Sequence, residues 1–257
     1  ASGHRALRER QRTVSLRPFF CYYGGKWRAA PKYPLPEHDT IVEPFAGAAG
    51  YSTRYPDHKI VLVERDPIVA GLWRYLTKVT PGEILRLPDI PEGATVDDLP
   101  ICQEARHLVG FWLNKGASSP RKSPSAWMRQ GLRPNSYWGN GVRILLASQV
   151  ERIRHWQVIE GSYESAPNIE ATWFVDPPYQ KAGKHYRFSE LEFSNLAAWV
   201  ETRYGLTITC ENVGADWLPF VPFMRAKASE AKRGGKVSLE AVHIRRVAMP
   251  IAVSEVA

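Results

Sequence analysis

The tetrapeptide Asp176-Pro177-Pro178-Tyr179 has the residue types for holding a flat base that carries an exocyclic amine. Its two prolines have a fixed φ and donate no backbone hydrogen bond, so their carbonyl oxygens face outward with little freedom. The Asp176 carboxylate and a proline carbonyl can accept hydrogen bonds from the amine, while the Tyr179 ring can stack on the base. Four residues alone fit a capped turn with an exposed tyrosine equally well, so the rest of the chain must decide.

A buried strand is expected directly before the tetrapeptide, because residues 172–175 form an apolar run that ends at the prolines. Another short strand, 40–42, leads into the small-residue turn Phe45-Ala46-Gly47-Ala48-Ala49-Gly50, and a short helix should follow. The glycines let the backbone approach a ligand, as in the first strand–turn–helix unit of nucleotide-binding α/β domains. The turn lacks the first glycine of the dinucleotide fingerprint, which argues against an NAD site.

Two further predicted strands end at residues suited to a nucleoside. Glu64 follows the strand 59–63, where an acid can accept hydrogen bonds from ribose hydroxyls, although it could also be an ordinary strand-end acid. Ser162 and Tyr163 follow the strand 155–159, where an adenine ring could be held. Near the start of the chain, Gly24-Gly25-Lys26 offers a tight backbone approach and a cation for a carboxylate, but this pattern alone is common.

The remaining periodicity completes an α/β pattern. Helical spacing of apolar residues, together with a capping-box pattern at 189–192, predicts helices at 67–79, 101–115, 142–153 and 189–204. Closing strands are predicted at 206–210 and 237–247. Loops are expected at 81–100, 117–141, 180–188 and 220–235, and the third of these should lie over the site.

A formal net charge of +8 favours a polyanionic partner, although a solvated surface is the default interpretation. Much of this charge lies in the segment 117–141, and no acidic residue occurs between Lys115 and Val150. Cationic side chains in this segment alternate with Trp127, Tyr137 and Trp138, a mixture that suits contact with the phosphates and bases of nucleic acid. A solvated loop over a small satellite core is the alternative.

Composition argues against several other classes of protein. A hydrophobic content of 44% and a charged content of 23% are ordinary for a globular chain. Cys21, Cys102 and Cys210 lie far apart and form no CxxC pair, so we expect neither a zinc site nor a disulfide framework, and no required metal. No apolar run reaches membrane-spanning length and no signal-peptide core is evident, so we expect a cytoplasmic protein without a membrane partner.

Taken in order, these segments resemble the Dam-type DNA adenine-N6 methyltransferases, the alpha group of amino-methyltransferases. A Gly-Gly-Lys segment comes first, then the FxGxxG turn at 45–50, then an insertion, then the DPPY tetrapeptide. The resemblance covers residues 19 to about 244. It implies an α/β fold with a Rossmann-like S-adenosylmethionine-dependent methyltransferase sheet and helices on both faces. The catalytic core would comprise residues 17–80 and 142–257, with a target-recognition insertion at 81–141.

The resemblance also implies roles for individual residues. Those that would bind the cofactor S-adenosylmethionine are Tyr23, Gly25, Lys26, Glu43, Phe45, Gly47, Gly50, Glu64, Ser162, Tyr163 and Asp176. Ser162 departs from the family, which usually carries an Asp there for the adenine amine, and Tyr163 replaces the usual Phe. The catalytic residues would be Asp176, Pro177, Pro178 and Tyr179. The basic residues that would contact DNA are Lys115, Arg121, Lys122, Arg129, Arg133, Lys184 and Arg187.

The implied reaction moves a methyl group from S-adenosylmethionine to the N6 amine of an adenine flipped out of double-stranded DNA, leaving S-adenosylhomocysteine. A cytosine-N4 methyltransferase needs the same chemistry and is the nearest alternative, but Asp176 and the motif order favour adenine. RNA or protein-glutamine methylation fits less well, because the latter usually carries Asn at this position. A non-catalytic DNA-binding regulator on the same scaffold would show decay of the turn or of DPPY, and both are intact. The implied setting is the cytoplasm of a prokaryotic or phage-infected cell.

Overall fold

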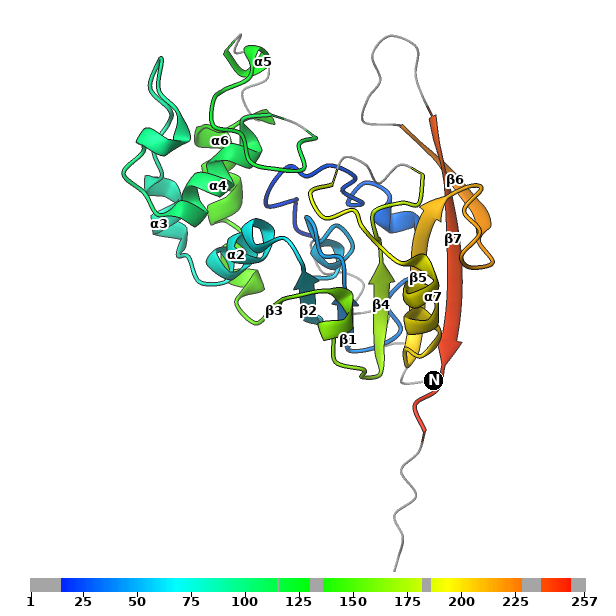
Figure 1. Cartoon of the computed structure of the whole chain (residues 1–257). Coiled ribbons are helices and arrows are strands. Elements are labelled where there is room, and N and C mark those ends of the chain that lie inside the picture. Colours follow the sequence, from blue (N-terminus) through cyan, green and yellow to red (C-terminus); the bar gives the residue numbers. More distant parts are fainter. Residues whose placement is uncertain (1–14, 115, 130–135, 182–185, 228–236, 251–257) are drawn as a thin grey trace, which may run out of the picture.

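A mixed seven-stranded sheet forms the centre of the computed structural model, which describes residues 15–114, 116–129, 136–181, 186–227 and 237–250 (Figure 1). Its strand order is β3-β2-β1-β4-β5-β7-β6. The strands are β1 Thr40–Glu43, β2 Lys59–Glu64, β3 Gln157–Glu160, β4 Ala171–Val175, β5 Gly205–Asn212, β6 Val221–Lys227 and β7 Val237–Val247. Strands β3, β2, β1, β4 and β5 run parallel, and β7 runs antiparallel to both β5 and β6. The predicted α/β class is therefore confirmed.

The central strands are mostly buried because both faces of the sheet are covered. Ile41 on β1 and Phe174 on β4 belong to one buried cluster, whereas their neighbours Val42 and Trp173 belong to a second cluster. Helices α2 Pro67–Leu76 and α4 Gln103–Trp112 bury their apolar sides in the first cluster. Helix α7 Phe193–Glu201 packs into the second cluster on the other face. In Figure 1 the helices α3, α4 and α6 lie beyond the β3 edge, and the β6–β7 pair forms the opposite edge.

The connection that was expected to be a loop at 81–100 contains two short helical segments instead. Helix α3 Pro81–Arg86 begins with a capping box between Thr80 and Glu83, and the 3-10 segment Val96–Asp98 begins with another between Thr95 and Asp98. A capping box satisfies backbone donors that a short helix cannot pair internally. Apolar side chains from both segments are buried in the first cluster, so packing stabilises turns that are too short for a visible periodicity.

Other boundaries were also wrong. Ser189 does not cap α7, which begins at Phe193 with Glu192 as its N-cap and no side-chain cap bond. The expected loop at 220–235 contains β6, because residues 221–227 pair with β7. The helix predicted at 142–153 divides into α6 Asn140–Ala147 and a 3-10 segment Val150–Ile153. A short helix α5 Ala126–Arg129 lies within the segment that was expected to be a loop at 117–141.

The segment 81–141 packs against the remainder of the chain. Helix α4 packs on α2, and α3 packs on α6. Its buried residues Leu108, Phe111 and Trp138 share one cluster with Ile41 and Phe174 of the sheet. The role of 81–141 as a target-recognition insertion stays a prediction. Across the described ranges, no helix has the length and apolar character that a bilayer-spanning segment needs.

Candidate functional site

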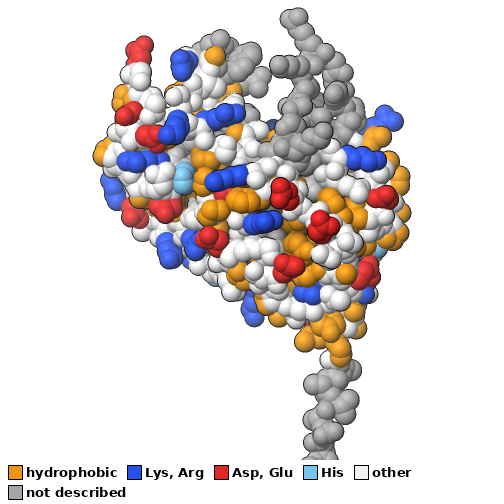
Figure 2. All heavy atoms as spheres, viewed as in Figure 1, with side chains coloured by type: hydrophobic (Ala, Val, Ile, Leu, Met, Phe, Trp, Pro, Cys, Tyr) orange, Lys and Arg blue, Asp and Glu red, His pale blue; other side chains and the backbone are white. Residues whose placement is uncertain are grey.

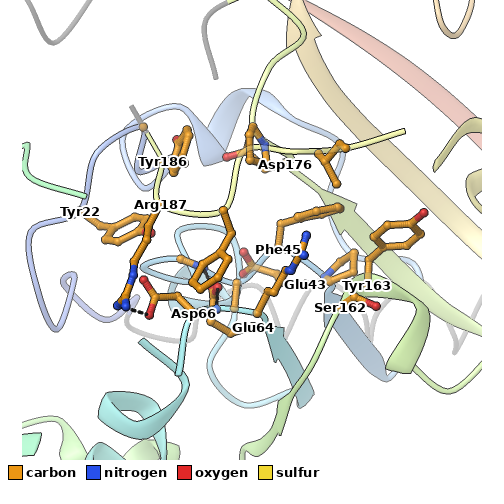
Figure 3. A pocket seen from close by; sticks show the side chains of 18 of the residues that line it. Tyr22, Glu43, Phe45, Glu64, Asp66, Ser162, Tyr163, Asp176, Tyr186 and Arg187 are labelled. Atoms are coloured by element: carbon orange, nitrogen blue, oxygen red, sulfur yellow. Dashed lines mark hydrogen bonds and ion pairs between the residues drawn. The ribbon is translucent and has the colours of Figure 1, made fainter. Parts of the chain in front are cut away.

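A pocket of about 450 Å³ lies at the carboxyl ends of the parallel strands (Figure 3). Residues that follow β1, β2, β3 and β4 line it, together with the glycine segment near the start of the chain. The chain leaves β1 toward β2 on one side and returns to β4 on the other, so the pocket sits where the direction of winding reverses. Ligands of open α/β sheets bind at such a reversal. The volume falls in the range of about 300–1,000 Å³ that is typical of small-molecule sites.

The structure brings together every residue that the family resemblance assigned to the cofactor. The eleven lining residues of that set are Tyr23, Gly25, Lys26, Glu43, Phe45, Gly47, Gly50, Glu64, Ser162, Tyr163 and Asp176. Of the predicted catalytic residues, Asp176 and Pro178 also line the pocket. Pro177 and Tyr179 are not among the lining residues, although each adjoins one that is.

The small-residue turn after β1 is fixed by bonds to its neighbours. The Gly47 amide donates to Glu64 Oε2 at 2.9 Å, and the Trp73 indole of α2 donates to the Gly47 carbonyl at 2.7 Å. Gly47 has a φ of +45°, a conformation that favours glycine. The turn is therefore positioned by both the next strand and the next helix.

Gly50 is required for a different reason from the one that the sequence suggested. A Cβ at this position would lie 2.6 Å from the Trp27 nitrogen and 2.9 Å from the Lys26 nitrogen. The close approach seen at Gly50 is thus between two backbone segments of the protein. This contact holds the Gly-Gly-Lys segment against the glycine turn and brings Lys26 into the pocket.

The acidic residues that end β1 and β2 accept hydrogen bonds from backbone amides. Glu43 is 2% exposed and accepts from the Ser52 amide at 2.6 Å. Glu64 accepts from the Gly47 amide at 2.9 Å and from the Asp66 amide at 2.9 Å. Burial raises the pKa of Glu43 to about 8 and that of Glu64 to about 7, and these amide bonds oppose the rise. Both carboxyl groups therefore titrate near neutral pH.

Asp176 is held by charged side chains instead. Lys26 Nζ lies 2.9 Å from Asp176 Oδ1 and 4.8 Å from the centre of the Tyr179 ring. The Tyr179 hydroxyl donates to Glu240 Oε2 on β7 at 2.6 Å. Burial raises the pKa of Asp176, and the ammonium of Lys26 opposes that rise. Burial would lower the pKa of Lys26, but the carboxylates of Asp176 and Glu240 outweigh it and raise that pKa, so Lys26 carries its charge.

Asp176 retains capacity to accept a hydrogen bond. Its Oδ1 is buried and has no hydrogen-bond partner of acceptable geometry among the described residues, although the ammonium is close. The Asp176 side chain is 17% exposed, and a carboxylate can accept several bonds, so it can accept a further bond from an amine in the pocket. The cation of Lys26, which the sequence offered to a ligand carboxylate, is paired with Asp176. The predicted stacking of Tyr179 on a base stays a prediction, since one partner of its ring is Lys26.

The end of the pocket next to β3 is aromatic. Phe45 and Tyr163 stack with ring centres 5.5 Å apart and planes 27° apart, and Ser162 precedes Tyr163. In Figure 3 this end lies on the opposite side of Phe45 from Asp66 and Tyr22.

Residues 186–188 line the other end of the pocket and belong to the segment that was expected to form a loop over the site. The Tyr186 hydroxyl donates to the Tyr23 carbonyl at 3.3 Å, and the two rings meet edge to face at 5.5 Å. Arg187, predicted to contact DNA, lines the pocket with its guanidinium 3.6 Å from Asp66 Oδ1, and its side chain is 52% exposed (Figure 3).

Three of the other predicted DNA contacts lie in one part of the segment 117–141. Arg121, Lys122 and Arg129 are exposed; Lys122 pairs with Asp97 at 2.6 Å and Arg129 donates to the Pro124 carbonyl at 3.1 Å. Lys115, Arg133 and Lys184 lie outside the described residues. Figure 2 shows Lys and Arg side chains spread over the lobe that carries α3 and α4, with acidic side chains between them.

Sequence reasoning missed several lining or supporting residues. Asp66 lines the pocket and caps α2, which the pattern Asp66-Pro67 after a strand could have revealed. Tyr22 lines the pocket among the aromatics next to the recognised glycines. Glu240 had no local signal, because it reaches the site from the antiparallel strand β7.

The chain matches no model of a known protein family, and no curated protein sequence matches it. Within the described ranges, no group of three or more His, Cys, Asp or Glu side chains is placed to hold a metal ion.

Proposed function

We propose that this protein is an S-adenosylmethionine-dependent DNA methyltransferase that acts on the N6 amine of a flipped-out adenine. One observation carries the proposal. Eleven residues from separate segments, chosen for a nucleoside cofactor, line one pocket at the winding reversal of the sheet, and Asp176 stands in that pocket. The finer assignment of the sheet as a methyltransferase fold belongs to the same proposal.

The residues present suit S-adenosylmethionine. Glu64 already accepts two amides, yet its carboxylate has lone pairs left for ribose hydroxyls. The stacked pair Phe45 and Tyr163 offers an apolar surface for an adenine ring. Asp176 lies in the pocket with its side chain 17% exposed, so its carboxylate can accept a bond from a reacting amine in addition to its ion pair with Lys26.

When bound, S-adenosylmethionine supplies an electrophilic methyl group on a sulfonium. The chain's own task is to make a weakly nucleophilic amine attack it. Asp176 and the Pro177 carbonyl accept the two N–H bonds of the amine, which draws its lone pair out of conjugation and stabilises the positive charge that develops. Lys26 favours the ionised form of Asp176, since it opposes the rise in pKa that burial causes. The rest of the catalysis is positioning, and no base is needed before attack.

The acceptor base must leave the duplex to reach Asp176, which costs a few kcal/mol. Stacking on Tyr179, of order 1–3 kcal/mol, would offset much of this cost. The bond from Tyr179 to Glu240 fixes the ring for that contact.

The test is transfer of labelled methyl from S-adenosylmethionine to unmethylated DNA, with the modified nucleoside identified by mass. N6-methyladenine is the expected product. Detection of N4-methylcytosine would leave the mechanism at Asp176 unchanged but would show that the acceptor base is cytosine. Absence of transfer to DNA by a protein that binds the cofactor would overturn the proposal and favour another acceptor or the non-catalytic DNA-binding regulator.

A further inference from the structure

Ser162 and Glu164 form a pair of polar side chains at the aromatic end of the pocket. Both line it, on either side of the buried Tyr163. The Ser162 hydroxyl donates to Glu164 Oε2 at 3.0 Å. They lie at the start of the 3-10 segment Tyr163–Ser165, directly after β3.

This pair presents only hydrogen-bond acceptors to a ligand. A serine hydroxyl has one proton, and Ser162 uses it on Glu164. Its remaining lone pairs and the other oxygen of the Glu164 carboxylate are then left as acceptors. Such a pair suits an amine with two N–H bonds and disfavours a carbonyl oxygen, which would face acceptors without a donor.

The aromatic neighbours indicate what carries that amine. Phe45 and Tyr163, stacked 5.5 Å apart, supply an apolar flat surface beside the acceptors. A flat heteroaromatic ring with an exocyclic amine matches both features, and adenine has that amine where hypoxanthine has a carbonyl.

We infer that Glu164, oriented by Ser162, is the residue that selects the adenine ring of the nucleoside cofactor by accepting a hydrogen bond from its amine. This inference rests on the proposed function for the presence of that cofactor. The resembled family usually carries an Asp at the position of Ser162. In this chain the carboxylate would instead come from Glu164, two residues further along.

The experiment measures binding of S-adenosylhomocysteine and of S-inosylhomocysteine, in which a carbonyl replaces the amine, by titration calorimetry of the full chain. The wild-type protein should bind the adenine form at least about tenfold more tightly, since a hydrogen bond to a charged group is being lost. Glu164→Gln should lower the affinity for the adenine form by roughly tenfold and remove most of the preference, because an amide can turn an N–H toward the carbonyl. Ser162→Ala should cause a smaller loss of about threefold.

Glu170→Gln is the matched control, since Glu170 is exposed on the loop after the same 3-10 segment and does not line the pocket. It should bind both ligands as the wild-type protein does. Because Glu164 is itself exposed, the melting temperature of Glu164→Gln should match that of the control.

The outcomes separate this inference from the proposed function. A preference for adenine that survives in Glu164→Gln would overturn the inference and leave the cofactor in place. A wild-type protein that binds neither ligand would overturn both. Binding that depends on Glu164 in a protein that transfers no methyl group to DNA would support the inference and overturn the proposed reaction.

Discussion

At the β1–β2 side of the pocket, Glu43 and Glu64 accept hydrogen bonds from backbone amides within 20 or so residues of themselves in sequence. At the β4 side, Asp176 is held by Lys26, and Tyr179 by Glu240, which come from opposite ends of the chain. The first arrangement follows from the local turn, whereas the second needs distant segments to be assembled. We therefore expect changes on the β4 side to alter methyl transfer and binding of the acceptor base, and changes on the β1–β2 side to alter cofactor binding and stability.

The largest effect should follow from Asp176→Ala, because it removes the acceptor that polarises the amine. Transfer should fall by at least about 100-fold, as when one preorganised hydrogen-bonding group is lost from a transition state. The affinity for S-adenosylhomocysteine, measured by calorimetry, should stay within about threefold. Asp57→Ala, at an exposed ion pair with Arg152, is the control. Retained turnover in the Asp176 variant would remove this residue from the mechanism.

Lys26→Met tests whether a charged side chain controls the protonation of Asp176, in contrast to the backbone amides that bind Glu43 and Glu64. Without the ammonium, the largest influence that opposes burial and Glu240 is lost, so the pKa of Asp176 rises further. The carboxylate form is the active one, so the acidic limb of the profile of kcat/KM against pH should move to higher pH. Activity at neutral pH should fall by roughly tenfold or more, since one pKa unit is tenfold in population, and should partly return in alkaline buffer. An unshifted limb would show that Lys26 does not control Asp176.

Tyr179→Ala should weaken productive binding of the base without changing cofactor affinity. The loss of stacking predicts an increase in KM for DNA of roughly 10-fold to 100-fold. Tyr179→Phe keeps the ring but leaves Glu240 without its 2.6 Å partner, so it should have a smaller effect on KM and a larger one on stability. Steady-state kinetics over a series of DNA concentrations measures both variants. Equal kinetics for Tyr179→Ala and the wild-type protein would contradict stacking.

Gly50→Ala tests the close backbone contact between the glycine turn and the segment that contains Lys26. Its Cβ would meet backbone nitrogen at 2.6 Å, so one segment must move. We expect a loss of about 1–3 kcal/mol in the free energy of unfolding, as for overpacking of a core. Gly71→Ala, in α2 with nothing within 4 Å of the new Cβ, should instead stabilise by about 0.5–1 kcal/mol. Urea titrations of the two variants give the comparison, and a neutral Gly50→Ala would show that the contact is not tight.

The smallest effect concerns the pH dependence of stability on the β1–β2 side. Burial raises the pKa of Glu43 from 4.5 to about 8, so the folded state binds more protons than the unfolded state between these values. Stability therefore falls as the pH rises from about 5 to 8. Glu43→Gln keeps an acceptor for Ser52 and should make this fall shallower, by about a kcal/mol or more across the range. Identical slopes for variant and wild type in denaturant titrations would contradict a buried, titrating Glu43.

The residues at the strand ends could be predicted from the sequence because neighbouring residues specify both a strand and the turn that follows it. The turn at 45–50, Glu64 and Ser162 each follow an apolar run, and parallel strands end at one edge of a sheet, so these residues had to meet. Helix α3 was missed because it is six residues long and depends on its Thr80 cap and on packing. The start of α7 was misplaced because a Ser-x-x-Glu pattern gives only a propensity.

The sequence by itself determined the α/β class and the ends of most strands, and its resemblance to a known family named side chains that line one pocket. Only the tertiary structure decided how those side chains are used: that Lys26 pairs with Asp176, that Glu240 holds Tyr179, and that Gly50 accommodates backbone. The reason is physical. A strand and its end are specified by neighbouring residues, whereas an ion pair between residues 26 and 176 exists only after the chain has brought them together in a buried place where each charge needs the other.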